Sequence, residues 1–177
     1  LNAAAASLSG SHTNAAANID LSANSPADWI HWGYKPVELD RKAGVTPQIT
    51  DYTRVGGADP GATTLVSSAY SWSDGISPGG NISGTRTGDR VFQVGKGFQF
   101  TVPANTTLKT LKVYVGANAA QGKLTATFSD SSASPYNVTV IQNSGRTRRE
   151  INLNFRAGSS GQTLTIKYVV TAKSSNS

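Results

Sequence analysis

Apolar and polar residues alternate along most of the second half of this 177-residue chain, and this period of two constrains the fold more than any other feature. Every second residue is Leu or Val in LKVYV, residues 111–115, and Ile, Leu or Phe in INLNF, residues 151–155. Such alternation is typical of strands that bury one face of a sheet. Turn-forming segments such as VPANT, NAAQG and AGSSGQ separate the strands, and no window keeps a helical period. The sequence therefore predicts an all-β fold, an antiparallel β-sandwich or barrel.

The first half of the chain has a different composition, which sets the expected domain boundaries. Residues 1–17 are rich in Ala, Ser and Asn, and residues 173–177 are similar. We expect the first segment to be a flexible tail and the second a linker stub, on either side of one module at residues 18–172. Gly, Ser, Asp and Pro dominate residues 57–90, which predicts long loops that bind a ligand. The start, LNAAAASLSG, is expected of a fragment or processed chain.

Composition narrows the class of protein. The chain has no cysteine, which excludes a disulfide framework and thiolate metal sites. No apolar run approaches the roughly 20 residues that a membrane span needs. The net charge of +6 suits nucleic acid, an anionic surface or an acidic polysaccharide. The basic residues are dispersed, however, with one cluster at Arg146, Arg148 and Arg149, so a nucleic-acid partner is not expected.

The reactive residues form no familiar catalytic motif. The chain lacks a GxSxG elbow, an HExxH pair and a Walker loop, and its only histidines are His12 and His31. No aspartate or glutamate lies in an apolar segment that would raise its pKa for glycoside hydrolysis. The DxDxDG spacing of a calcium loop is absent, so a structural calcium has no support from spacing. We expect a non-catalytic protein without a cofactor.

Aromatic residues between positions 29 and 72 are the strongest indication of a binding site. Sugars stack their apolar C–H faces on such rings and form hydrogen bonds with polar neighbours, and DWIHWGYK and YSWSDG contain both kinds of residue. The alternative is that the rings fill a core, the usual place for tryptophan. For each tryptophan the two interpretations stay open. The predicted ligand-binding residues are Trp29, His31, Trp32, Lys42, Trp72, Asp74 and Arg86.

The spacing within DWIHW also predicts which rings face solvent. In an extended chain Trp29 and His31 lie on one side, and Ile30 and Trp32 lie on the other. Because Ile30 favours a core, Trp29 and His31 are expected to be the more exposed pair. Trp72 is the favoured tryptophan for ligand contact. For His31 itself, a structural role is the favoured alternative.

Several segments together resemble one family of modules. The resembling segments, which cover most of residues 18–171, include ADWIHWG, RKAG, YSWSDG, GTRTG, GFQFTVPANTTLKTLKVYVG and GKLTATFSD. They are similar to galactose-binding-like modules of large secreted bacterial proteins, a group that includes many carbohydrate-binding modules. The resemblance implies a jelly-roll sandwich that holds an attached enzyme on its polysaccharide, often with a structural calcium.

The predicted function is therefore a non-catalytic carbohydrate-binding module of a secreted, multimodular bacterial protein. Its expected partners are a polysaccharide, an acidic one if the positive charge takes part, and covalently linked neighbouring domains. A second interpretation is a structural spacer or adhesion domain of a cell-surface protein, with the tryptophans in the core. A third, a glycan lyase, would require tyrosine to converge with arginine or lysine in a cleft.

Overall fold

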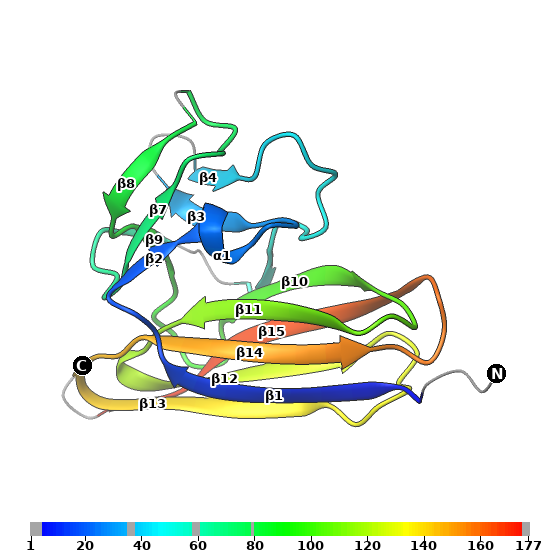
Figure 1. Ribbon diagram of the computed structural model, residues 1–177. Helices are drawn as coiled ribbons and strands as arrows, with labels where there is room; N and C mark the ends of the chain where they lie inside the picture. The colour runs from blue at the N-terminus through cyan, green and yellow to red at the C-terminus, as the bar shows by residue number, and fades with distance from the viewer. Residues whose placement is uncertain (1–4, 35–37, 58–60, 79, 175–177) are drawn as a thin grey trace.

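The computed structural model of the chain describes residues 5–34, 38–57, 61–78 and 80–174, and its fold is built almost entirely of β-strands. The long strands form two antiparallel sheets (Figure 1). The three-stranded sheet has the order β1 (Ser7–Asn14), β14 (Arg149–Arg156), β11 (Lys109–Val115). The five-stranded sheet has the order β13 (Tyr136–Arg146), β12 (Asn118–Phe128), β15 (Gln162–Lys173), β10 (Gly97–Ala104), β5 (Thr53–Val55). The predicted all-β antiparallel sandwich is confirmed, and its jelly-roll connectivity stays a prediction.

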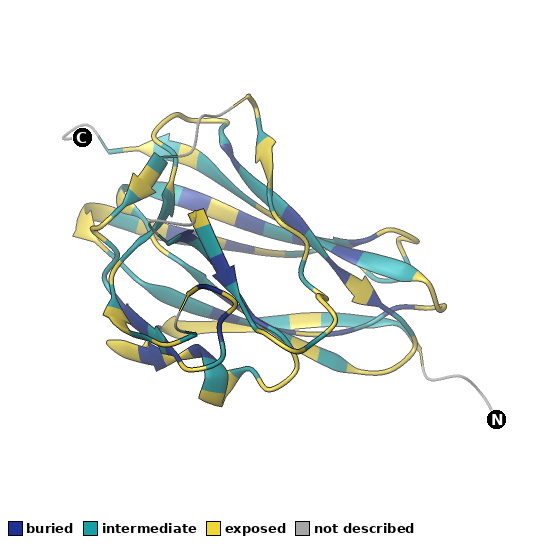
Figure 2. Ribbon diagram, turned by 90° about the horizontal axis from the view of Figure 1, so that it is seen from above, coloured by how far each residue is buried: buried dark blue, intermediate teal, exposed yellow. Residues whose placement is uncertain are grey.

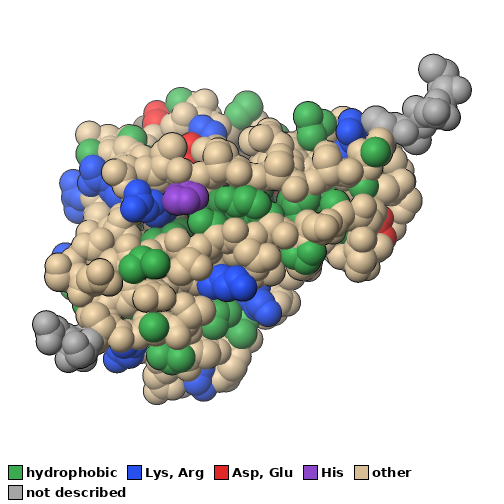
Figure 3. Space-filling model, turned by 90° about the horizontal axis from the view of Figure 1, so that it is seen from below, with side chains coloured by type: hydrophobic (Ala, Val, Ile, Leu, Met, Phe, Trp, Pro, Cys, Tyr) green, Lys and Arg blue, Asp and Glu red, His purple; other side chains and the backbone are tan. Residues whose placement is uncertain are grey.

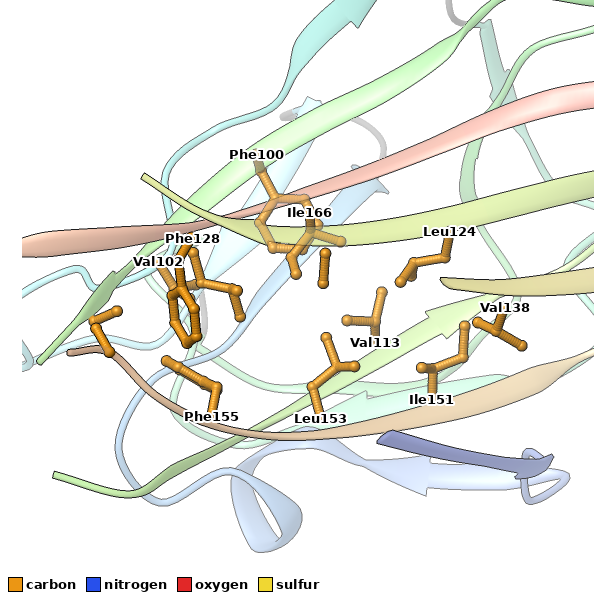
Figure 4. Close-up of a cluster of buried hydrophobic side chains, with 14 of the residues drawn as sticks. Phe100, Val102, Val113, Leu124, Phe128, Val138, Ile151, Leu153, Phe155 and Ile166 are labelled. Atoms are coloured by element: carbon orange, nitrogen blue, oxygen red, sulfur yellow. The ribbon is translucent and has the colours of Figure 1, made fainter. Parts of the chain in front are cut away.

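The two sheets bury the faces that the sequence alternation predicted. Register places Val113 of β11 opposite Ile151 of β14, and both side chains point to the same face of the three-stranded sheet. Leu124 and Ile166 lie on the facing side of the five-stranded sheet (Figure 4). Leu124 and Ile151 are 0% exposed, so the central part of the sandwich core is closed to solvent. Each such side chain stabilises the fold by about 1.5–3 kcal/mol.

The first strand corrects the expectation of a flexible tail. Residues 7–14 form β1, which pairs with β14 from Ser7 opposite Arg156 to Asn14 opposite Arg149. The expectation is therefore wrong for residues 7–17, since Ala15 is also buried. The physical reason is that β pairing uses backbone N–H and C=O groups, which Ser, Gly and Thr supply as well as apolar residues do. At the other end, β15 extends to Lys173, and residues 175–177 lie outside the described residues.

The remaining short elements form a second layer, which we call the N-terminal layer and which lies above the sandwich in Figure 1. Its three small sheets are β2–β7–β8, β3–β4 and β6–β9, with β2 parallel to β7. The elements are β2 (Asn18–Asp20), α1 (Leu21–Asn24), β3 (Ile30–Tyr34), β4 (Glu38–Arg41), β6 (Gly61–Thr63), β7 (Ala69–Trp72), β8 (Ile82–Thr85) and β9 (Gly88–Arg90). Residues 57–90, predicted as long loops, thus contain four of these strands. Figure 2 shows exposed residues on strands as well as in turns, as in β8, where two of the four residues are exposed.

A second hydrophobic core holds the N-terminal layer together. It contains Ile19, Leu21, Trp29, Tyr70 and Trp72, and the half-buried ring of Tyr114 packs against it from β11 of the sandwich. This contact joins the layer to the three-stranded sheet. No helix in the described part of the chain is long and apolar enough to cross a membrane.

The basic cluster noted in the sequence also serves this junction. Arg148 donates from Nε to the Ala15 carbonyl oxygen at 2.8 Å and from Nη1 to that of Ser67 at 3.3 Å. Arg149 donates to the side-chain oxygen of Asn14 in β1. These guanidinium groups therefore tie β14 to β1 and to the N-terminal layer.

Deletion of residues 1–14 should destabilise the fold, because β14 loses its partner along one edge and Leu8 leaves the sandwich core. We expect the free energy of unfolding to fall by about 3 kcal/mol, and the melting temperature by roughly 10 °C. Deletion of residues 1–4, which precede β1, is the matched control. Thermal unfolding followed by circular dichroism measures both, and equal melting temperatures would contradict the pairing.

Candidate functional site

Each of the three tryptophans donates a hydrogen bond from its indole nitrogen to an aspartate. The pairs, with their Nε1–Oδ distances, are Trp29–Asp74 at 2.9 Å, Trp72–Asp40 at 2.8 Å and Trp32–Asp51 at 2.7 Å. Trp29 and Trp72 are each 2% exposed, whereas Trp32 is only half-buried. The same pairing therefore occurs in two environments, one inside the second core and one at the surface.

The second core gathers most of the aromatic residues singled out in the sequence. The ring centroids of Trp29 and Trp72 are 5.2 Å apart. His31 lies 5.1 Å from Trp72 and 5.1 Å from Tyr70, the latter edge-on. Tyr34 meets the Trp72 ring edge-on at 5.4 Å. These rings contact one another, so at Trp29, His31 and Trp72 the core interpretation describes the structure.

The expected exposure of Trp29 and His31 is wrong. His31 is 7% exposed and Trp29 is 2% exposed, while Trp32 projects from the opposite side of β3. The physical reason is that β3 is covered on both sides, by the second core on one and by Phe100 of β10 on the other. The side of β3 that carries Ile30 is therefore not its only covered side, and the side that carries His31 is buried as well.

Lys42 and Asp74 form an ion pair that supports the second core. The Asp74 carboxylate accepts hydrogen bonds from Lys42, from the Ser22 hydroxyl and from Trp29. Desolvation opposes ionisation of Asp74, but these three donors outweigh it and lower its pKa. Asp74 therefore contacts both Trp29 and Lys42, and Lys42 forms its ion pair with Asp74.

Arg86 lies apart from the other predicted residues. It is exposed, and its Nη1 donates to the Ser67 carbonyl oxygen at 2.8 Å. The seven predicted residues therefore do not form one site. Five belong to the second core or its edge, whereas Trp32 and Arg86 each lie elsewhere.

A groove of about 460 Å³ opens beside Trp32, on the far side of β3 from the second core. It lies where β3 and β4 meet β5, the edge strand of the five-stranded sheet. Its lining residues are Trp32, Glu38, Leu39, Asp51, Tyr52, Thr53, Arg54 and Asp89. Two aromatic side chains and four charged ones thus line one concave surface.

Packing and hydrogen bonds fix the two aromatic rings of the groove. Trp32 packs 5.2 Å from Phe100, and Tyr52 packs edge-on 5.0 Å from Phe98, so both rings rest on β10. Trp32 and Tyr52 meet edge-on at 5.8 Å. Asp51 accepts from both the Trp32 indole and the Tyr52 backbone N–H, each at 2.7 Å. The aromatic wall is therefore held in one orientation before a ligand arrives.

The segment that carries Asp51 and Tyr52 is positioned by Asp28. One oxygen of Asp28 accepts from the backbone N–H groups of Gln48 at 2.7 Å and Ile49 at 3.0 Å. Thr53 then enters β5 opposite Gln99 of β10. The chain between β4 and β5 is thus fastened at both ends of the groove segment.

Tyr52 is a neutral hydrogen-bond donor in the groove. Its hydroxyl donates to Asp89 Oδ2 at 2.9 Å. Partial burial, followed by the hydrogen bond and charge of Asp89, raises the pKa of Tyr52 far above its ordinary value. The phenol therefore keeps its proton across the physiological range.

Six polar residues of the groove lining are absent from the predicted binding set: Glu38, Asp51, Tyr52, Thr53, Arg54 and Asp89. The available signal was the run DYTR at residues 51–54, which joins an acid, an aromatic ring and a base. Its relation to Trp32 depends on the pairing of β5 with β10, which is a long-range contact.

A larger cavity of about 880 Å³ lies between the N-terminal layer and the sandwich. Apolar side chains such as Phe98, Val113 and Tyr168 line much of it. Two buried atoms of its lining residues, Asp28 Oδ1 and His31 Nδ1, have no hydrogen-bond partner within the described structure. Trp32, Tyr52 and Asp89 line both this cavity and the groove. Much of the rest of the cavity lining is apolar, and a sugar hydroxyl buried against an apolar side chain would lack a partner. The groove is therefore the better candidate for a glycan.

Among the described residues, no three His, Cys, Asp or Glu side chains are grouped closely enough to hold a metal ion. The chain matches no protein-family model, no curated protein and no solved structure. The resemblance to galactose-binding-like modules therefore stays a prediction that rests on the sequence segments.

Replacement of Trp72 by alanine is expected to destabilise the protein strongly, because it empties the centre of the second core and leaves the buried Asp40 short of a donor. We expect a loss of about 3–5 kcal/mol in the free energy of unfolding. Phe92→Ala is the control, since Phe92 is 58% exposed and should lose well under that amount. Urea unfolding measures both, and a small effect at Trp72 would place its ring outside the core.

Stability should fall as pH decreases from neutral toward 4, because of His31. Burial, opposed only in part by the charge of Asp40, lowers the pKa of folded His31 from 6.5 to about 4. Between these values the unfolded state binds a proton that the folded state does not, so the free energy of unfolding declines. The decline due to His31 is about 3 kcal/mol in total.

Urea unfolding at a series of pH values measures this dependence. His31→Phe removes the titrating group and keeps a ring against Tyr70 and Trp72, so its stability should vary much less with pH over the same range. Asp74 titrates below this range, because its pKa is lowered from 3.8. An unchanged pH dependence in His31→Phe would assign the effect to another group.

Proposed function

We propose that the protein is a non-catalytic carbohydrate-binding module and that the groove beside Trp32 is its sugar-binding site. The observation that carries the proposal is the pair of fixed aromatic rings, Trp32 and Tyr52, at the wall of a solvent-open groove with polar groups around it. Sugars need this combination, because their C–H faces stack on rings and their hydroxyls need hydrogen-bond partners.

The polar residues supply both kinds of partner. Asp51, Asp89 and Glu38 carry acceptors for sugar hydroxyls, and Arg54 carries guanidinium donors in a planar arrangement. Shallow, open sites of this kind bind weakly, with dissociation constants of about micromolar to millimolar. Binding of many units of one polysaccharide would raise the effective affinity.

A non-catalytic role fits the work that two of the carboxylates already do. Asp51 accepts a hydrogen bond from the Trp32 indole and so orients the ring, and Asp89 accepts a hydrogen bond from the Tyr52 hydroxyl. Both carboxylates thus hold an aromatic ring in place, which is the role of a residue that shapes a binding surface. The secreted, multimodular bacterial setting and the role of anchoring an attached protein to a polysaccharide belong to the same proposal, and the sequence resemblance supports them.

A spacer or adhesion domain without a sugar site is the second candidate. The observation that favours it is the burial of Trp29 and Trp72, which leaves Trp32 as the one tryptophan near the surface. This candidate predicts no glycan binding at all, so one binding experiment distinguishes the two.

Trp32→Ala should weaken binding at least tenfold, about 1.4 kcal/mol, because it removes the larger stacking surface. Affinity electrophoresis on neutral, amino-sugar and acidic polysaccharides measures the loss. Phe92→Ala removes another exposed ring that lies outside the groove and should bind like the unmodified protein. Melting temperatures confirm that both variants fold. No binding to any polysaccharide, or equal binding by Trp32→Ala, would contradict the proposal.

A further inference from the structure

The groove and the whole molecule carry opposite charge. The chain has a net charge of +6. The described residues that line the groove include Glu38, Asp51 and Asp89 but only one cation, Arg54, which gives a formal charge of −2. The sandwich face opposite the N-terminal layer shows several Lys and Arg side chains and few Asp or Glu (Figure 3). The overall charge is therefore a poor guide to the ligand of this groove.

We infer that the groove binds amino sugars with a free ammonium group, such as glucosamine units, and rejects uronates. The inference rests on the proposed function, because it names the class of sugar that the same groove selects. It replaces the acidic polysaccharide suggested by the net charge with a sugar of opposite sign.

The arrangement of rings and carboxylates carries the argument. A cation over an aromatic face is attracted by the ring, and an adjacent carboxylate adds direct Coulomb attraction. Trp32 and Asp51 together provide both attractions, because the exposed Asp51 carboxylate accepts a hydrogen bond from the Trp32 indole. A sugar stacked on Trp32 therefore has the Asp51 carboxylate close to it, at the edge of the indole ring. Glu38, which is also exposed, lines the same groove.

A uronate in the same position would meet repulsion. Its carboxylate would approach Asp51, and like charges at close range are disfavoured. Arg54 is the one cation among the described lining residues, and Arg54, Glu38 and Asp89 each have a further interaction of their own. The charges therefore discriminate between sugars that the aromatic rings alone would treat alike.

Three oligosaccharides of equal length separate charge from stacking: a glucosamine oligomer, its fully N-acetylated and neutral counterpart, and an oligogalacturonate. Isothermal titration calorimetry at low salt and mildly acidic pH should rank the glucosamine oligomer about fivefold tighter than the neutral one, with the uronate weakest. Salt should reduce this preference, because it screens surface charges.

Asp51→Asn is the decisive variant. The asparagine amide oxygen still accepts from the Trp32 indole, so the ring keeps its support while the charge is lost. We expect the preference for glucosamine, measured as the ratio of the dissociation constants of the neutral and the glucosamine oligomers, to fall severalfold, because a loss of binding common to both oligomers cancels in this ratio. Asp130→Asn is the matched control, since Asp130 is an exposed aspartate outside the groove lining and should leave the preference intact.

The outcomes separate this inference from the proposed function. If the neutral oligomer binds through Trp32 but glucosamine binds no tighter, or the uronate binds equally well, the inference is wrong and the proposed function stands. An unchanged preference in Asp51→Asn overturns the assignment to Asp51. If none of the three oligosaccharides binds, both the proposed function and the inference fail.

Discussion

The N-terminal layer is organised around one buried carboxylate, that of Asp40, which is 0% exposed. It accepts hydrogen bonds from the Trp72 indole and from the backbone N–H groups of Arg41, Ile76 and Ser77. A buried carboxylate is costly unless its oxygens are satisfied, so these donors must stay where they are. A Cβ at residue 75 would lie 2.4 Å from Asp40 Oδ2, which explains the glycine of YSWSDG. β4, which carries Asp40, also forms one wall of the groove.

Three tryptophan–aspartate pairs with the same chemistry serve different ends because their surroundings differ. Around Trp29 and Trp72, rings close over the pair and the result is a core. Around Trp32, the ring rests on Phe100 and one side stays open, and the result is a wall of the groove. Burial, and not residue type, distinguishes a structural tryptophan from a candidate binding one.

The long strands were predictable because alternation such as that of residues 151–155 records which face is buried. β1 was not, since its Ser, Gly and Thr residues are held by backbone pairing with β14, which leaves no apolar period. The presence of an aromatic cluster was predictable, but which of its rings face solvent was not. Both sides of β3 are covered, and Gly33, with φ of +75°, lies at a bulge in the strand. The groove needs Tyr52 of one segment beside Trp32 of another, and long-range contacts bring them together: β5 pairs with β10, and Trp32 packs on Phe100 of β10.

The walls of the groove belong to both parts of the molecule. Trp32 and Glu38 come from the N-terminal layer, while Thr53 and Arg54 belong to the edge strand of the large sheet. A ligand that touches both walls acts as a clamp between them, and its binding energy opposes their separation. Ligand binding therefore stabilises the folded protein. At a ligand concentration one hundred times the dissociation constant, the free energy of unfolding rises by about 2.7 kcal/mol. The protein with this groove occupied would therefore be more stable toward unfolding than the same protein with the groove empty.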